Sequence, residues 1–393
     1  MKFVNLKLIN FKNYTNCSLN FNPRFNFIYG ENGNGKTNLL EALSLLCFTK
    51  SFLQNSELDC LKNGENNFEI NANVLSDINV LNKVEFKFNK DNQKKEIFLD
   101  NNSIQRFNNF FGTLPITVLS PYDLKLTSGL PIDKRRNFDI LISQISKIYY
   151  NDLKDLAKIV KNKNSLLKEN LLFKKYSSGK LYSLLEPWNE KLIEIGTRII
   201  SKRIEFFNEF KDYFYLEFNK IVNNNISPEI IYKSEIFDAI ENDKIDIDKL
   251  KNDFINVLQN KNELEISRGV CLVGPHRDNY IFSIYKNGVN FEIKTFGSQG
   301  EHKTFLVALK IAEYNYLKDK INNSSIGQPV LLLDDLFSEL DRNRTEKIAS
   351  MLVDINQIFL TTTDYRYMDI IGKYFQKDDI TSFYVANGTA QTN

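Results

Sequence analysis

A glycine-rich segment near the start of the chain constrains the fold more than any other feature of the sequence. Residues 30–37 fit the pattern G-x-x-x-x-G-K-[ST]. They follow a strand-like stretch, Phe25–Tyr29, and precede apolar residues at helical spacing from Asn38 to Phe48. In this context the glycines let backbone N–H groups approach phosphate oxygens at the start of a helix. The segment therefore predicts a phosphate-binding loop in an α/β fold.

The residues of this loop have distinct expected tasks. We expect Lys36 to reach the terminal phosphates and Thr37 to bind Mg²⁺. The expected phosphate contacts extend along the whole segment, through Gly30, Glu31, Asn32, Gly33, Asn34, Gly35, Lys36, Thr37 and Asn38. A nucleoside triphosphate with Mg²⁺ is the ligand that this segment indicates.

A buried strand near the other end of the chain ends in two acids. Val330–Leu333 is apolar and runs into Asp334 and Asp335. One carboxylate can hold Mg²⁺, a task we assign to Asp334, while Asp335 can position the attacking water. Residues 38–329 separate this strand from the loop, a distance that small-molecule kinases and GTPases rarely need. The run closest to a guanine-binding motif, Asn82–Glu85, ends in the wrong acid.

A third motif lies between the first two and favours one class of ATPase. Ser298, Gln299 and Gly300 precede a helix expected over residues 303–317 and resemble the signature of ABC-type ATPases. In that superfamily the signature of one subunit touches the γ-phosphate held by the other, so Ser298 is expected to act in trans within a closed dimer. The D-loop position falls on residues 338–341, including Glu339 and Asp341, and the switch position falls on Thr362.

Three parts are expected along the chain. Residues 1–130 form the first part of an ATPase head, with a strand over 4–9 and an alternating, sheet-like lobe over 65–99. Residues 131–265 are expected to form a helical arm, and residues 266–393, with strands over 269–273 and 280–285, are expected to complete the head. The predicted fold is an α/β, ABC-type P-loop ATPase head, a mixed sheet flanked by helices, with an inserted helical arm.

Two features of composition bear on location. The sequence has no 18-residue apolar run and no cationic leader before an apolar block, which argues against membrane spanning and secretion. The four scattered cysteines suit a reducing cytoplasm, where we expect the protein. They are Cys17, Cys47, Cys60 and Cys271.

Charge is segregated within the expected arm although the whole chain carries a formal charge of only +2. Residues 147–180 are rich in lysine and residues 229–265 are rich in acids. On a helix, Lys154, Lys158 and Lys161 would share one face, where they could follow DNA phosphates without reading bases. The alternative, which the sequence supports equally, is that these lysines form a solvent-exposed helix face that binds nothing.

Several further motifs together resemble the RecF family, and the resemblance runs from Met1 to beyond Thr363. Its implications are an ATP-dependent DNA-binding dimer and slow, DNA-stimulated ATP hydrolysis. The resemblance further implies a role in recombinational repair and replication-fork maintenance at double-stranded, gapped or junction DNA. It implies RecR and RecO as partner proteins. The resemblance also places Lys12 and Asn13 near the nucleotide and Arg135 and Arg136 in an arginine-rich segment, which makes these two arginines candidates for DNA binding. The motifs that carry it are Asn10–Tyr14, Ser120–Leu124, Gly274–Asp278 and Leu332–Asp341.

The chain departs from the family pattern at a few positions. Glu301, His302 and Lys303 stand where Gln-Gln-Arg is common, and Lys12 stands for an arginine near the adenine. Tyr122 replaces a glutamate, which leaves Asp123 as the candidate acid of that segment. One alternative function is an ABC-type ATPase of another SMC-like DNA-processing complex. A second is the ATPase of a transport complex, which should co-purify with membranes. A third is a P-loop kinase, which should phosphorylate a small substrate.

Overall fold

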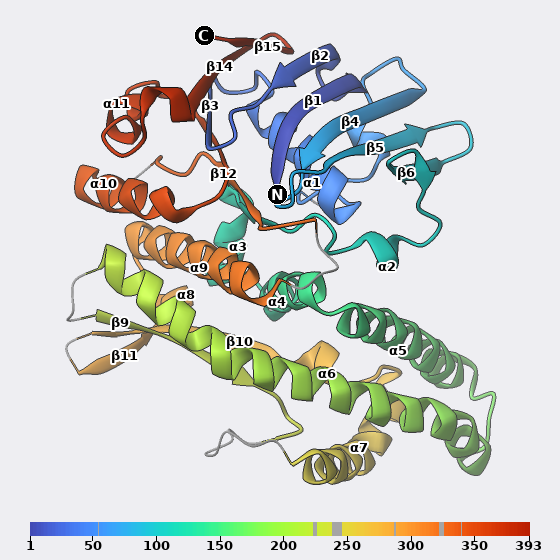
Figure 1. Cartoon of the computed structure of the whole chain (residues 1–393). Helices are drawn as coiled ribbons and strands as arrows, with labels where there is room; N and C mark the ends of the chain where they lie inside the picture. Colours follow the sequence, from blue (N-terminus) through green and yellow to red (C-terminus); the bar gives the residue numbers. More distant parts are fainter. Residues whose placement is uncertain (54, 223–225, 238–245, 287, 322–325, 339) are drawn as a thin grey trace. The chain divides into compact units, whose positions relative to one another are not determined.

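The computed structural model describes residues 1–393 except 54, 223–225, 238–245, 287, 322–325 and 339. The chain forms two compact units, and Figure 1 labels most of the helices and strands that make up each of them. Unit 1 comprises Met1–Leu124, Tyr213–Ser227 and Gly297–Asn393, and unit 2 comprises Lys125–Asp212 and Pro228–Phe296. Within the described part of the chain, no helix has the length and apolar character needed to cross a membrane.

Unit 1 contains two six-stranded sheets and the helices that pack on them. The strands are β1 (Lys2–Phe11), β2 (Tyr14–Asn20), β3 (Phe25–Tyr29), β4 (Asn67–Leu75), β5 (Leu81–Asn89), β6 (Lys94–Leu99), β7 (Asn102–Ser103), β8 (Ile116–Leu119), β12 (Val330–Asp334), β13 (Ile358–Thr362), β14 (Ile380–Ala386) and β15 (Thr389–Thr392). The main helices are α1 (Lys36–Phe48), α2 (Phe107–Phe110), α9 (Gln299–Lys320), α10 (Arg342–Met351) and α11 (Tyr367–Ile371).

The first sheet is antiparallel, with the order β2-β1-β4-β5-β6-β7. Its strands alternate between buried and exposed positions, and Phe68, Ile70, Val84 and Phe86 are all fully buried on one face. The sheet-like lobe predicted for residues 65–99 is thus confirmed. Strand β2 was not predicted, because the polar residues 10–13 suggested a longer turn than the tight one that joins β1 to β2.

The second sheet carries the nucleotide motifs and has the order β15-β14-β3-β13-β12-β8. All its strands run parallel except β15, which pairs antiparallel with β14. Because parallel strands are covered on both faces, β12 and β13 are continuous buried runs without alternation. This explains why Val330–Leu333 is entirely apolar.

Helix α1 joins the cores of the two sheets. Its leucines are buried all around the helix, and they belong to one cluster with side chains from both sheets. A helix that is apolar on every side needs such a two-sided environment. The packing fixes the helix N-terminus, and with it the phosphate loop, at the end of β3.

Unit 2 contains helices and a small sheet. Its elements are α3 (Leu124–Ser128), α4 (Pro131–Ile145), α5 (Lys147–Phe173), most of α6 (Ser178–Ile221), most of β9 (Ile226–Lys233), α7 (Ile247–Arg268), β10 (Asn279–Lys286), β11 (Val289–Glu292) and α8 (Ile293–Phe296). The sheet has the order β11-β10-β9.

Unit 2 differs from the expected helical arm in three respects. Strand β9 was not predicted, and the strand predicted over 269–273 is wrong, since Gly269 ends α7 in the left-handed conformation and a turn follows. Residues 266–296 belong to unit 2 and residues 213–227 to unit 1, so the boundaries differ from the expected 131 and 265. Apolar side chains of β10 pack on helices of unit 2, among them Phe138 against Tyr280 and Phe282, a pairing that local periodicity does not reveal.

Candidate nucleotide site

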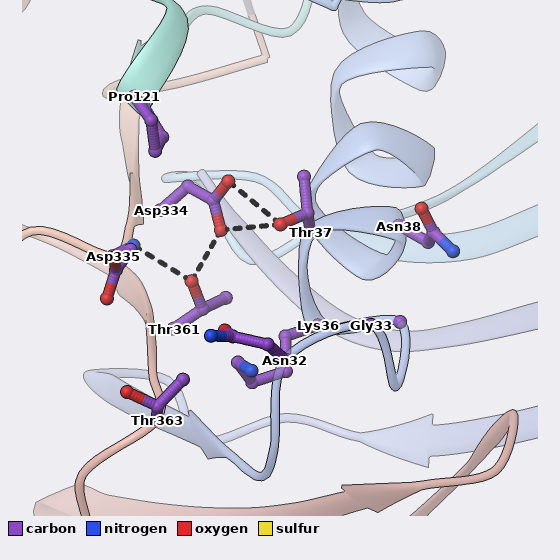
Figure 2. Close-up of a pocket in the computed structure, with 11 residues that line it drawn as sticks. Asn32, Gly33, Lys36, Thr37, Asn38, Pro121, Asp334, Asp335, Thr361 and Thr363 are labelled. Atoms are coloured by element: carbon purple, nitrogen blue, oxygen red, sulfur yellow. Dashed lines mark hydrogen bonds between the residues drawn. The ribbon is translucent and has the colours of Figure 1, made fainter.

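A pocket of about 240 Å³ opens at the carboxyl ends of the parallel strands of unit 1 (Figure 2). Ligands of open parallel sheets bind at this edge, because the connections that follow the strands diverge there. The phosphate loop supplies one wall, and the acidic strand and its neighbour supply the other. The lining residues are Asn32, Gly33, Gly35, Lys36, Thr37, Asn38, Pro121, Asp334, Asp335, Thr361 and Thr363.

The loop needs glycine at two positions, one for its backbone conformation and the other also for lack of space. Gly33 and Gly35 have φ values of 82° and 111°, which favour glycine over residues with a Cβ. A Cβ on Gly35 would also lie 2.5 Å from Asn13 Nδ2. That Nδ2 donates to the carbonyl of Asn34 at 2.8 Å, and Asn38 Nδ2 donates to Asn13 Oδ1 at 2.8 Å. Asn13 therefore braces the outside of the loop and does not line the pocket.

The ammonium of Lys36 folds back onto its own loop. Its Nζ donates to the carbonyls of Gly30 at 2.8 Å and Glu31 at 2.9 Å. Burial lowers the pKa of Lys36, while the nearby Asp334 and Asp335 act in the opposite direction. Phosphate oxygens in the pocket would offer this cation stronger, charged acceptors than two neutral carbonyls.

Thr37 and Asp334 meet across the pocket. Thr37 Oγ1 lies 2.9 Å from each carboxylate oxygen of Asp334, and Thr361 Oγ1 donates to Asp334 Oδ1 at 2.6 Å, as the dashed lines in Figure 2 show. Asp334 is only 6% exposed, and burial raises its pKa against the effect of these two hydroxyl donors. A hydroxyl and a carboxylate are oxygen ligands of the kind Mg²⁺ prefers.

These two side chains would be the protein's part of a magnesium site that phosphates complete. Among the residues that the structure describes, no cluster of three or more His, Cys, Asp and Glu side chains could hold a metal ion. Mg²⁺ in nucleotide sites is typically held by one or two side chains together with phosphate oxygens and water. The residues present therefore fit Mg²⁺ bound with a nucleotide.

The backbone of Asp335 turns sharply after β12. Its φ is 49°, in the left-handed region, and its N–H lies 3.1 Å from both the carbonyl oxygen and Oγ1 of Thr361. Asp tolerates this conformation better than β-branched residues do. The turn separates the two acids: Asp334 contacts Thr37, whereas Asp335 lines the pocket without that contact.

The end of β13 presents Thr361 and Thr363 to the pocket, and not Thr362. Side chains alternate along a strand, so Thr362 points to the opposite face, where it is 2% exposed and its Oγ1 accepts from the N–H of Asp364. Thr362, to which the switch position was assigned, therefore does not line the pocket, whereas Thr361 and Thr363 on either side of it do. Thr361 was not predicted as a site residue, although the same alternation could have identified it.

Comparisons with known proteins agree over almost the whole chain. The family model "RecF/RecN/SMC N terminal domain" matches residues 2–378. The DNA replication and repair protein RecF of Chloroherpeton thalassium is 34% identical over 369 residues, which cover 93% of this chain and 95% of that protein. The RecF protein of Alkaliphilus oremlandii is 34% identical over 389 residues and 98% of each chain. This chain belongs to the RecF family.

Solved structures support the same assignment. A structure described as the recombination mediator protein RecF with ATP in the RecFOR pathway has a TM-score of 0.83 and 29% identity, covering 100% of this chain and 99% of that one. An Smc head domain from Pyrococcus furiosus has a TM-score of 0.56 at 16% identity, a likeness of fold alone. The predicted ABC-type ATPase head is thereby confirmed.

The segment predicted as the ABC-type signature lies at the start of α9, and none of its three residues lines the pocket of its own chain. Ser298 is the N-cap: its Oγ accepts from the N–H of Glu301 at 3.3 Å, and the Glu301 carboxylate accepts from the Ser298 N–H at 2.9 Å. This reciprocal capping box accounts for Glu301, one of the departures from the family pattern. Ser298 and Gln299 are exposed and Gly300 is half-buried.

Lys303, another departure, connects α9 to the segment after the acidic strand. Its Nζ contacts both the carbonyl and the hydroxyl of Ser338, the latter at 2.7 Å, and Ser338 Oγ in turn donates to the carbonyl of Asp335 at 3.1 Å. Asp341 caps α10 through the N–H of Arg344. Glu339 of the expected D-loop lies outside the described residues.

Two residues implied by the family resemblance have structural partners away from the pocket. Lys12 Nζ pairs with Glu41 of α1 at 3.3 Å, where Glu41 is fully buried. Asp123 caps the turn after β8 by accepting from the Ser120 N–H at 2.6 Å, and it lies 3.7 Å from Lys310. Neither residue lines the pocket, and Pro121 is the residue of that segment that does.

The arginine and lysine candidates for DNA binding differ in accessibility. Lys154, Lys158 and Lys161 are all exposed on α5, and Arg136 is exposed on α4. Arg135 is half-buried and donates to the carbonyl of Asp278 at 2.6 Å. Its interior contact makes it a weaker candidate for a phosphate.

The Gly274–Asp278 segment belongs to the core of unit 2. Asp278 is 2% exposed and pairs at 2.7 Å with Arg203, which is itself 1% exposed and also pairs with Asp139 at 2.9 Å. A buried arginine with two carboxylate partners and a carbonyl from Pro275 has its charge and donors satisfied. The segment therefore has a structural task in this family member.

Proposed function

We propose that this RecF-family chain is an ATP-dependent DNA-binding protein in which ATP closes a dimer on DNA and slow hydrolysis releases it. The observation that carries the proposal is the meeting of Thr37 and Asp334 beside Lys36 in one pocket. Phosphate, metal and water positions are thereby provided from two distant segments. The solved structure of a RecF protein with ATP, together with the RecF relatives, supports ATP as the nucleotide.

Within the pocket, the loop N–H groups and Lys36 bind the phosphates, and Asn13 holds the loop in shape. Bound Mg²⁺ would neutralise charge on the phosphates, held by Thr37 and, directly or through water, by Asp334. Asp335 would orient the attacking water, because it lines the pocket but makes no contact with Thr37. The catalytic groups of one chain are then Lys36, Asp334 and Asp335.

The missing contribution would come from a second copy of the chain. Ser298, Gln299 and Gly300 are at the N-terminus of α9, where free N–H groups and the helix dipole favour an anion. None of them lines the pocket of its own chain, and we propose that they contact the γ-phosphate held by a partner. ATP would then act as the bridge between two heads.

DNA would bind through phosphates on unit 2. The exposed Lys154, Lys158 and Lys161 lie on one side of α5 and resemble a backbone-tracking row, not a base-reading one. We propose non-sequence-specific binding to double-stranded, gapped or junction DNA, with stimulation of ATP hydrolysis. A solved relative is described as a recombination mediator of the RecFOR pathway, which supports a role in recombinational repair with RecR and RecO.

The test is the mass of the full chain by light scattering, with and without ATP and Mg²⁺, for two variants at the signature. Ser298→Asp keeps a capping oxygen at the helix start but places a negative charge against the partner's phosphate. Ser298→Asn keeps the cap without the charge, because Asn is an equally good N-cap. We expect ATP to double the mass of the wild type and of Ser298→Asn, and not of Ser298→Asp.

The DNA part of the proposal is tested by the salt dependence of binding in the presence of ATP. Replacing Lys154, Lys158 and Lys161 together by Gln should weaken binding of every DNA sequence alike and reduce the slope of log affinity against log salt. A chain that stays monomeric while hydrolysing ATP would contradict the proposal and favour a kinase-like ATPase.

A further inference from the structure

The turn between α5 and α6 exposes an aromatic ring among lysines. We define the hairpin tip as residues 168–180, which comprise the last turn of α5, the connection and the first turn of α6. We propose that Phe173 at this tip stacks on an unpaired DNA base where a duplex ends or is interrupted. The inference rests on the proposed DNA-binding function and adds to it the feature of DNA that is recognised.

Phe173 is the most exposed aromatic side chain in the described part of the chain, at 74%. Two of the nearby leucines have partners: Leu167 packs with Leu181 and Leu185 in a small core, and Leu171 lies against the turn at Gly269. Leu172, next to Phe173, is exposed like the ring. Phe173 is not part of that core. The end of α5 is therefore anchored by Leu167 and Leu171, while Leu172 and Phe173 are left in solvent.

The surroundings of the ring are basic. Lys168, Lys174, Lys175 and Lys180 are all exposed, and Glu169, the one acid of the tip, is paired with Lys175 at 2.6 Å. Arg268 ends α7 beside this group, since the neighbouring Gly269 lies against Lys168 and Leu171. An exposed ring in such a cationic setting suits a polyanion that also has apolar faces, which describes nucleic acid.

The basic residues continue from the tip along the side of α5. Lys154, Lys158, Lys161 and Lys168 are exposed at helical spacings of four, three and seven residues. At a rise of about 1.5 Å per residue, Lys154 and Phe173 are about 28 Å apart along the helix, or about eight base pairs of duplex. A row of this length can follow a DNA backbone. A lipid surface would contact only the tip and would leave this row without a partner.

The chemistry of the ring selects the position on DNA. Bases inside a continuous duplex are stacked on one another, so a phenyl ring reaches a free base face only at an end, a gap or a strand junction. Phe173 has no polar atom and thus cannot distinguish base edges. Stacking on any base is favourable, which predicts preference for a DNA structure without preference for a sequence.

The experiment measures binding of the full chain, held in its ATP state with a non-hydrolysable ATP analogue, to two DNA molecules of equal length. One is a continuous duplex, and the other has a single-stranded gap with 2-aminopurine as the first unpaired base. The variants are Phe173→Ala, Phe173→Leu, which keeps an apolar side chain, and Phe173→Trp, which keeps an aromatic one. Because the side chain is exposed, none of these changes should affect folding.

We expect Phe173→Ala and Phe173→Leu to bind the gapped DNA about tenfold more weakly, the loss typical of one base–aromatic stack. Binding to the continuous duplex should stay unchanged, and Phe173→Trp should match the wild type. The 2-aminopurine fluorescence, quenched by the wild type, should recover with Phe173→Leu.

Equal binding of both DNAs by all variants would overturn the inference while leaving the proposed function intact. Absence of ATP-dependent binding to the continuous duplex by the wild type would instead contradict the proposed function. Vesicles of anionic and zwitterionic lipid serve as the third ligand: binding that Phe173→Ala abolishes, with no effect on gapped DNA, would assign the tip to a membrane surface and overturn the inference.

Discussion

Thr37 Oγ1 lies 2.9 Å from both carboxylate oxygens of Asp334, although 297 residues separate the two in the chain. Helix α1 places the first and strand β12 the second, on the same edge of one parallel sheet. In the proposed magnesium site these two groups would supply oxygen ligands, and they already lie side by side.

Removing the hydroxyl of Thr37 should weaken Mg²⁺-dependent ATP binding without affecting the fold. Thr37→Val keeps the shape of the side chain but cannot ligate Mg²⁺, so we expect at least tenfold weaker ATP binding in the presence of Mg²⁺. Thr37→Ser keeps the hydroxyl and should bind nearly as well as the wild type. Titration of a fluorescent ATP analogue at several Mg²⁺ concentrations measures this, and equal Mg²⁺ dependence of Val and Ser would contradict the assignment.

Asp335→Asn should slow ATP hydrolysis strongly and preserve ATP binding. Loss of a group that positions and activates water typically lowers turnover about 10²–10⁴-fold. Asn also tolerates the left-handed backbone at φ 49°, so the variant should fold normally and accumulate as an ATP-bound dimer. Single-turnover hydrolysis and light scattering check the two parts. Asp335→Val is the contrast, since its β-branched side chain is incompatible with that backbone and should lower thermal stability.

Lys303 should influence hydrolysis through Ser338, which contacts the carbonyl of Asp335. Lys303→Gln removes the cation from this chain of contacts and should lower turnover more than it affects ATP affinity. Lys303→Arg restores a cation, in the form common in the family, and should recover most of the activity. Steady-state ATPase kinetics separate kcat from KM. A rise in KM alone would mean that Lys303 does not act on the hydrolytic step.

His276 should make unit 2 less stable in acid. Burial lowers its pKa from 6.5 to about 4, and its Nδ1 is buried without a hydrogen-bond partner among the described residues. The unfolded chain therefore binds the proton more readily between these values, so stability falls as the pH drops from 6.5 towards 4. At about 1.4 kcal/mol per pKa unit, the loss approaches about 3 kcal/mol.

The measurement is urea unfolding at pH 7 and pH 4.5 for the wild type and for His276→Gln, which carries no titrating group at this position. Other groups also titrate in this range, so the relevant quantity is the difference between the two proteins. We expect the wild type to lose about 2–3 kcal/mol more than the variant. Parallel losses in both proteins would show that His276 is accessible to protons in the folded state.

The phosphate loop and the acidic strand, which the sequence placed in one predicted site, line one pocket in the structure, and both motifs are local in sequence. The glycines and Lys36 act through a short loop, and the apolar run before Asp334 is the pattern of a parallel strand covered on both faces. Alternation along β13, had it been applied, would have placed Thr361 and Thr363 in the pocket in place of Thr362.

Unit 2 was harder to predict because its organisation depends on distant partners. Arg203 and Asp278 form a buried ion pair that the half-buried Asp139 extends, yet each looks like an ordinary surface charge in its own segment. Strand β9 is likewise stabilised by pairing with β10, and helical neighbours on both sides obscured it. The DNA-binding tasks of the lysines on α5 remain predictions.

The central strand β3 lies between β13 and β14, both from the last part of the chain. During synthesis the phosphate loop therefore emerges long before the strands that flank it. At about 5–20 residues per second, the interval between Gly35 and Asp334 is about 15–60 s. Through that interval the apolar residues of β3 lack the neighbouring strands β13 and β14 that pair with it in the folded chain. The pocket is complete only when Asp334, Asp335, Thr361 and Thr363 have all been synthesised, which requires nearly the whole chain.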